Sequence, residues 1–98
     1  MKRILIAANT RSARGRGEHI LREARTGLSQ AGVHCEVLVS RHHGHLFEEL
    51  PVLLREKWDA IAALGGDGTL FQVINACLRQ PDFNTPLALI PAGTGNSF

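Results

Sequence analysis

Hydrophobic positions along the 98-residue chain alternate between short apolar runs and longer segments with helical spacing. Residues 4–8 form a continuous apolar run, which is typical of a strand buried on both faces of a parallel sheet. Segment 33–39 alternates apolar and polar residues, which predicts a second strand that is less buried on one side. Segments 59–64 and 86–90 predict a third and a fourth strand.

The segments between these strands carry the spacing of amphipathic helices. An apolar stripe predicts helices over 18–31 and 69–78. Segment 46–57 is helical in composition, but Pro51 interrupts it. Because proline is tolerated in a first turn and costs about 3 kcal/mol inside a helix, we expect this helix to begin near Glu48 or later.

The alternation of strands and helices predicts an α/β fold, a three-layer α/β/α arrangement of the Rossmann-like type with a parallel sheet. In such a sheet the carboxyl ends of all strands lie at one edge, where ligands bind. The glycine-bearing loops 9–17, 65–69 and 91–96 each follow a predicted strand, so we expect them to meet at that edge.

Size and composition limit the possible functions. The length predicts one small domain, and an apolar content of 44% suits a folded core. A net charge of +2 is too small to imply nucleic acid or an anionic membrane as a partner. No apolar segment reaches the length of a membrane span, and the run near the start is too short for a signal peptide.

Other residues are interpreted as packing groups of a cytoplasmic protein. Cys35 and Cys77 have no metal-binding or redox spacing, which favours reduced core residues. Trp58 and Phe71 are likewise assigned to packing in the core or at its rim. Because a second glycine loop lies at the very end of the chain, we expect the chain to be part of a longer protein.

The strongest chemical signal is the sequence Gly65-Gly66-Asp67-Gly68-Thr69, a tight turn between a strand and a helix. Glycines let a ligand approach the backbone, and the amide groups of a helix N-terminus attract anions. The sequence is neither a Walker A loop nor a dinucleotide-binding fingerprint. The context nevertheless predicts a cradle for phosphate.

Asp67 is unexpected in such a turn because a carboxylate repels phosphate. At about 4 Å the repulsion is ~1 kcal/mol in water and ~4 kcal/mol at an intermediate dielectric. Asp67 could bind Mg²⁺ that also contacts the phosphates, or accept a proton from a hydroxyl nucleophile. It could also simply cap the helix beginning near Gly68.

A second group of polar residues, Gly93-Thr94-Gly95-Asn96, offers backbone donors, a hydroxyl and an amide. These groups could hold the phosphates or the sugar of a nucleotide. The same residues also suit an ordinary turn between a strand and a helix, and the sequence leaves both interpretations open.

Charged loops complete the candidate residues. Arg11, Arg14 and Arg16 lie beside Ser12 in the first loop and would help to neutralise a triphosphate. A solvated basic loop is the alternative, and the role of each arginine stays open. The histidine-rich run 42–45 has no partner with suitable spacing for a metal, so we interpret it as a polar surface loop.

Taken together, three motifs resemble the catalytic domain of diacylglycerol kinases and their relatives, which include sphingosine, ceramide and bacterial lipid kinases. The motifs are Asn9-x-x-Ser12-x-x-Gly15-x-Gly17, Gly65-Gly66-Asp67-Gly68-Thr69 and Pro91-x-Gly93-Thr94-Gly95-Asn96. The middle motif alone is shared with the NAD kinases and is similar to one in phosphofructokinases. The first and third motifs narrow the resemblance to lipid kinases, and it covers the whole chain.

The resemblance implies that residues 1–98 form the ATP-binding N-terminal lobe of a two-lobed kinase, the lobe type shared by NAD and diacylglycerol kinases. It implies that residues 65–69 and 93–96 hold the nucleotide phosphates and that Asn9 and Ser12 belong to the nucleotide-site loop. By the same resemblance, Asp67 is associated with ATP and Mg²⁺, and in part of the family it is the proposed base. The lipid site would lie in a C-terminal lobe.

The chain departs from the family pattern at three positions. Thr10 stands where the family often has Pro, and Ala13 stands where it often has Gly. Ser97 stands where many bacterial members carry Asp, which weakens the assignment of a metal-linked carboxylate there. None of these departures affects Asp67.

The resemblance therefore predicts transfer of the γ-phosphate of ATP to a lipid hydroxyl, such as that of diacylglycerol or a sphingoid base. A protein of this kind would be cytoplasmic and would visit the membrane surface, with no nucleic acid partner; a homodimer is possible. Two alternatives remain: an NAD kinase-like enzyme, and a nucleotide-binding lobe without catalysis. The chain alone, without a second lobe, is expected to be inactive.

Overall fold

The computed structural model describes residues 2–11, 16–42 and 44–91, and within them the strands form one parallel sheet. The order across the sheet is β2-β1-β3-β4. The strands are β1 (Arg3–Ala8), β2 (His34–Val39), β3 (Ala60–Gly65) and β4 (Leu87–Pro91). Each begins and ends within about two residues of its predicted position.

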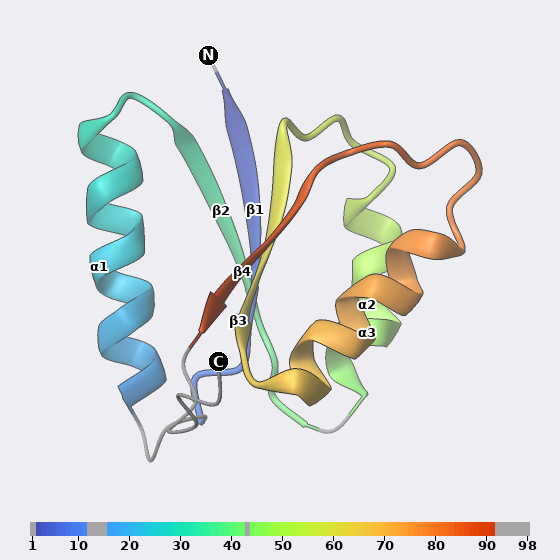
Figure 1. The fold of residues 1–98 in the computed structure, drawn as a ribbon, viewed down its shortest axis with the longest axis horizontal. Helices are drawn as coiled ribbons and strands as arrows, with labels where there is room; N and C mark the ends of the chain where they lie inside the picture. Colours follow the sequence, from blue (N-terminus) through green and yellow to red (C-terminus); the bar gives the residue numbers. More distant parts are fainter. Residues whose placement is uncertain (1, 12–15, 43, 92–98) are drawn as a thin grey trace.

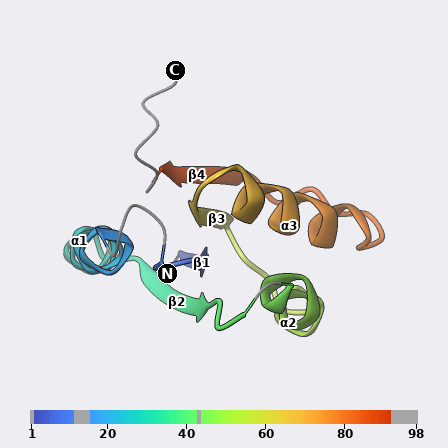
Figure 2. The same cartoon turned by 90° about the horizontal axis from the view of Figure 1, so that it is seen from below.

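The three helices of the described residues cover the two faces of this sheet (Figure 1). Helix α1 (Arg16–Gln30) lies on one face, and α2 (His45–Leu53) and α3 (Asp67–Leu78) lie together on the other. The view from below shows the sheet between the two layers of helices (Figure 2). The predicted α/β fold with a parallel sheet between helices is therefore confirmed.

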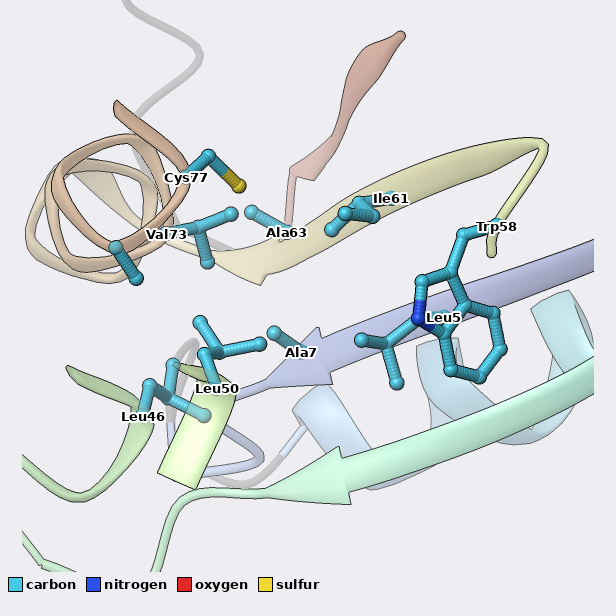
Figure 3. Close-up of a cluster of buried hydrophobic side chains, with 10 residues drawn as sticks. Leu5, Ala7, Leu46, Leu50, Trp58, Ile61, Ala63, Val73 and Cys77 are labelled. Atoms are coloured by element: carbon cyan, nitrogen blue, oxygen red, sulfur yellow. The ribbon is translucent and has the colours of Figure 1, made fainter. Parts of the chain in front are cut away.

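The two central strands supply both halves of the core because their side chains alternate between the faces. Leu5 and Ile61 point toward α2 and α3, where they meet Trp58 (Figure 3). Ile6 and Leu64 point the other way, toward α1. All four strand residues are at most 1% exposed, as expected for strands buried on both faces.

Helix α2 differs from its prediction. It begins at His45, not near Glu48 or later, and it ends at Leu53, before the predicted Lys57. Its N-cap is Gly44, whose φ of 83° places it in the left-handed region. The prediction for the start of this helix was therefore wrong.

The physical reason is the burial of two leucines on one side of α2. Leu46 and Leu50 are fully buried against the sheet and α3, and this burial requires the first turn to be helical. Pro51 lies inside the helix and cannot donate to the carbonyl one turn earlier. Proline therefore removes one backbone hydrogen bond, and the helix ends two residues later at Leu53.

The first loop is shorter than predicted because Arg16 and Gly17 belong to α1. Gly17 is buried, and a Cβ atom there would lie 2.7 Å from the carbonyl oxygen of Thr10. This glycine therefore allows the start of α1 to pack closely against the chain that leaves β1.

The sequence assigned four residues to packing, and the structure confirms this assignment for three of these residues. Trp58 and Cys77 are buried, and burial raises the pKa of the Cys77 thiol to about 11. Cys35 is half-buried, and desolvation raises its pKa as well. Phe71 is 63% exposed, so its assignment to packing was wrong. None of the described helices is long and apolar enough to cross a membrane.

Candidate functional site

The carboxyl ends of the strands meet at one edge of the sheet, as predicted. Ala8 pairs with Leu64, and Gly65 pairs with Pro91, so β1, β3 and β4 end side by side. The N–H of Asn9 donates to the carbonyl of Leu64 over 2.8 Å, which fixes the start of the first loop beside the glycine turn. The three strand ends from which the predicted loops start therefore lie side by side (Figure 1).

The glycine turn begins with a residue that must be glycine. Gly65 has a φ of 151°, which L-residues rarely adopt. A Cβ atom on Gly65 would also lie 2.5 Å from Oγ1 of Thr69. Thr69 is 4% exposed, so its side chain fills the space under the turn. Of the predicted phosphate-binding groups, Thr69 can therefore offer its backbone N–H rather than its hydroxyl.

The next two glycines are free of such constraints. A Cβ atom on Gly66 or Gly68 would meet no atom of the described residues within 4 Å, and both glycines are exposed. Gly66 is the N-cap of α3, and it makes no side-chain cap. The first amide groups of a helix have no partner within the helix, and they carry the positive end of its dipole. The turn thus presents open, bare backbone donors that suit an anion.

Asp67 lies in the centre of this open backbone. It is the first residue of α3 and is exposed, and the cap position belongs to Gly66. Its carboxylate makes no hydrogen bond or ion pair within the described part of the chain. The interpretation of Asp67 as the helix cap is therefore wrong, and a role toward a ligand remains.

The arrangement suits one magnesium ligand from the protein. Mg²⁺ in phosphate-binding sites is commonly held by one or two carboxylates together with phosphate oxygens and water. The exposed Asp67 can supply one such carboxylate next to the open backbone of the turn. Within residues 2–11, 16–42 and 44–91, no group of three or more His, Cys, Asp or Glu could hold a metal ion by itself.

The start of the first loop is held by side chains on the same edge. The Oδ1 atom of Asn9 accepts a hydrogen bond from the N–H of Arg11 over 3.1 Å. The Arg11 guanidinium donates from Nη2 to the carbonyl of Arg41, also over 3.1 Å. Asn9 therefore shapes the loop, and Arg11 joins it to the segment that follows β2.

Several predicted site residues cannot be placed. Pro91 ends β4 next to Gly65, so the third motif starts at the expected position. The remaining candidates lie outside the described residues, and their roles stay predictions: Ser12, Arg14, Gly15, Gly93, Thr94, Gly95 and Asn96.

Sequence reasoning missed the segment that follows β2. The side chain of His45 is only 12% exposed, and its Nδ1 accepts a hydrogen bond from the N–H of Arg41 over 2.7 Å. Its ring stacks on His42 with 4.7 Å between ring centroids. The run is thus partly an ordered network, not simply a polar surface loop. The sequence feature that could have revealed this network is the position of the run directly after a strand, because that position lies at the edge of the sheet where ligands bind.

A hollow of about 630 Å³ lies beside the site, between α1 and the end of β2, and the glycine turn does not line it. Thr10 and Val39 line the end of this hollow that is nearest the site. Arg22 and Arg25 of α1 line one of its sides. The glycine turn itself lies on the surface, where Gly66, Asp67 and Gly68 are exposed.

Comparison with known proteins identifies a matching family. The profile described as "Diacylglycerol kinase catalytic domain" matches residues 3–98. Sphingosine kinase 1 of Homo sapiens is 28% identical over 97% of this chain and 26% of its own length. Diacylglycerol kinase of Staphylococcus epidermidis is 35% identical over 99% of this chain and 30% of its own length.

A solved structure has the same fold. The crystal structure of a diacylglycerol kinase from Bacillus anthracis str. Sterne superposes with a TM-score of 0.79 and 26% identity. The match covers 99% of this chain and 35% of that one. The chain therefore spans about a third or less of the length of these relatives.

Proposed function

Because the chain belongs to the diacylglycerol kinase catalytic domain family, we propose that it forms the nucleotide-binding lobe of an ATP-dependent lipid kinase. The observation that carries this proposal is the open backbone of Gly66 and Gly68 at the N-terminus of α3, with the unpaired carboxylate of Asp67 between them. Such a site suits a phosphate chain that must come close to the backbone and also meet one acidic group.

In the proposed complex, the backbone donors of the turn hold the phosphates of ATP. The helix dipole and the free N–H groups stabilise negative charge on the phosphates, including the charge that shifts toward ADP during transfer. Gly93 to Asn96 and the Asn9–Ser12 segment would contact the same nucleotide from the two neighbouring loops. Mg²⁺, when bound, would neutralise phosphate charge, and Asp67 is the described residue placed to hold it.

The proposed reaction is the transfer of one phosphoryl group. A bond forms between the lipid hydroxyl oxygen and the γ-phosphorus, while the bond from that phosphorus to the β–γ bridging oxygen breaks. ADP leaves with the electron pair of the broken bond, and the hydroxyl proton passes to a base. Since such reactions depend mainly on positioning and charge stabilisation, one carboxylate that orders the metal or takes the proton is sufficient.

The substrate is proposed only as a lipid alcohol. The matched relatives include sphingosine kinases and diacylglycerol kinases at similar identities, so this chain does not choose between a sphingoid base and diacylglycerol. We place the lipid-binding residues in the remaining part of a longer protein, which would contact the membrane surface to reach its substrate.

The decisive experiment uses the full-length parent protein with γ-labelled ATP, Mg²⁺ and a mixed lipid extract, with Asp67→Asn tested in parallel. We expect label in a lipid product with the parent and a loss of at least about 100-fold with the variant. Asp82→Asn is the matched control, because it removes the same charge at an exposed residue of the opposite edge. Asparagine also tolerates the φ of 57° found there.

The outcomes separate the alternatives. Near-parental transfer by Asp67→Asn, with an unchanged thermal midpoint, contradicts the role of Asp67. A higher Mg²⁺ requirement in the variant indicates a metal ligand, whereas a lower rate at saturating Mg²⁺ indicates a base. Label in added NAD supports an NAD kinase-like enzyme. ATP binding without any transfer indicates a lobe without catalysis.

A further inference from the structure

A chain of hydrogen bonds joins the segment after β2 to the first loop of the candidate site. The N–H of Arg41 donates to Nδ1 of His45 over 2.7 Å. The carbonyl of the same Arg41 accepts from Nη2 of Arg11 over 3.1 Å. The N–H of Arg11 in turn donates to Oδ1 of Asn9 over 3.1 Å. The orientation of Arg41's backbone therefore connects His45 with Asn9.

The accepting nitrogen defines the protonation state of His45. An imidazole nitrogen that accepts a hydrogen bond carries no proton, so this hydrogen bond exists only while Nδ1 of His45 is unprotonated. The side chain is 12% exposed, and its ring stacks on that of His42 at an interplanar angle of 17°. The ring is therefore held in place and cannot simply turn to offer its other nitrogen.

We propose that His45 is a proton-sensitive latch between the β2–α2 segment and the first loop of the site. Histidine changes charge between about pH 5 and 8, and both nitrogens of an imidazolium are donors. When His45 is protonated, the N–H of Arg41 loses its acceptor and faces a second N–H. The backbone of Arg41 then turns away, and Arg11 loses the carbonyl that holds it beside Asn9.

Carboxylates of α2 lie near both rings of the stacked pair. Nε2 of His45 lies 3.8 Å from Oε1 of Glu49 on α2, so a carboxylate is close to the imidazole ring. Nε2 of His42 lies 3.7 Å from Oε1 of Glu48, so the stacked neighbour also has a carboxylate beside it. Two stacked imidazolium rings would repel each other and add to the opening. The charged or titratable groups around His45 among the described residues are Arg11, Arg41, His42, Glu48 and Glu49.

The latch is tested without any nucleotide by amide hydrogen exchange of residues 40–46 in the full-length parent protein. His45→Asn is the key variant, since its Oδ1 takes the place of Nδ1 as an acceptor and does not titrate. His19→Asn is the matched control, because His19 pairs with Glu23 on the exposed face of α1. After correction for intrinsic exchange, we expect protection to fall about fivefold from about pH 7.5 to about pH 5.5 in the parent and the control. An equal fall in His45→Asn, or no fall in the parent, overturns the proposal.

Coupling to the site is tested by the Mg-ATP dissociation constant of the same three proteins over the same pH range. The titration of ATP itself affects all three equally. We expect the parent and His19→Asn to lose about fivefold more affinity than His45→Asn on acidification. Equal losses overturn the coupling. This arm rests on the proposed function: absence of ATP binding at every pH would contradict that function, while hydrogen exchange would still decide whether the latch exists.

Discussion

Gly65, Gly66 and Gly68 occupy one turn for different physical reasons. Gly65 is required by the fold, because its φ of 151° and the adjacent Thr69 side chain leave no room for a Cβ atom. Gly66 and Gly68 are not required by any contact of the described residues. The free space above these two glycines is what the proposed approach of a phosphate to the backbone requires.

The same substitution at two of these positions should have opposite effects on stability. Gly65→Ala should lower the free energy of unfolding by at least about 1–3 kcal/mol, since it combines backbone strain with a clash. Gly68→Ala should raise it by about 0.5–1 kcal/mol, because alanine favours the helix. Urea denaturation measures both values.

The Gly68→Ala variant also tests the proposed nucleotide-binding site. Gly68→Ala should weaken Mg-ATP binding in spite of its greater stability, because its methyl group occupies the space that phosphate needs. Calorimetric titration of the full-length protein tests this expectation. If Gly68→Ala binds Mg-ATP as tightly as the parent, close approach of phosphate to this residue is excluded.

At the level of elements, α2 shows that burial outweighs intrinsic helix propensity. Its length is only nine residues and it contains Pro51, so the isolated segment would not form a stable helix. Two fully buried leucines hold it against the sheet and α3. Trp58 closes the end of the same cluster and donates from Nε1 to the carbonyl of Leu53 over 2.9 Å.

This explanation predicts a large difference between two positions of α2. Leu50→Ala should cost about 2–5 kcal/mol of unfolding free energy, because it leaves a cavity where the side chain is 0% exposed. Val52→Ala should change stability by less than about 0.5 kcal/mol, since Val52 is 58% exposed. Thermal or urea denaturation of both variants tests the difference; similar costs would mean that α2 is not held by its buried face.

The whole molecule has two functionally different edges. The carboxyl edge carries the open turn, and the opposite edge is tied together by Arg3. The Arg3 guanidinium donates to Glu36 on β2 over 2.9 Å and to Glu56 before β3 over 2.7 Å. It also lies 4.4 Å from the centre of the Trp58 ring. These contacts join three segments that are far apart in the sequence.

The Arg3 contacts should make stability depend on pH in acid. The hydrogen bond from Arg3 lowers the pKa of Glu36 below its ordinary value of 4.5. A carboxyl group with a lowered pKa in the folded state stabilises the protein above its ordinary pKa. That contribution is lost as the pH falls through the lowered value. Arg3→Met should therefore lower the thermal midpoint near neutral pH and have progressively less effect below about pH 4.

Arg55→Met is the control for this experiment, because it removes the same charge. Arg55 is exposed, and its side chain makes no hydrogen bond or ion pair with any described residue. A pH-independent difference between Arg3→Met and the parent would show that Arg3 acts through the Trp58 ring and the Lys57 carbonyl, to which its Nη1 donates over 3.1 Å, and not through its carboxylate partners.

Local patterns predicted the elements because they depend on neighbouring residues. The apolar runs of β1 and β3 and the apolar stripes of α1 and α3 are visible within about 15 residues of sequence. The start of α2 was mispredicted, because Pro51 is a local signal and the burial of Leu46 is not. Phe71 was misassigned for the same reason, since hydrophobicity alone does not say whether a partner covers the residue.

The sequence by itself determined the order of strands and helices along the chain. That order places the glycine loops and Asp67 at the carboxyl edge of the sheet. Backbone preferences and the handedness of parallel crossovers suffice for that conclusion. Only the tertiary structure distinguished Gly65 from Gly66 and Gly68, and only it connected His45 with Arg41. These distinctions depend on how close particular atoms come after packing, and no local pattern in the sequence carries that distance.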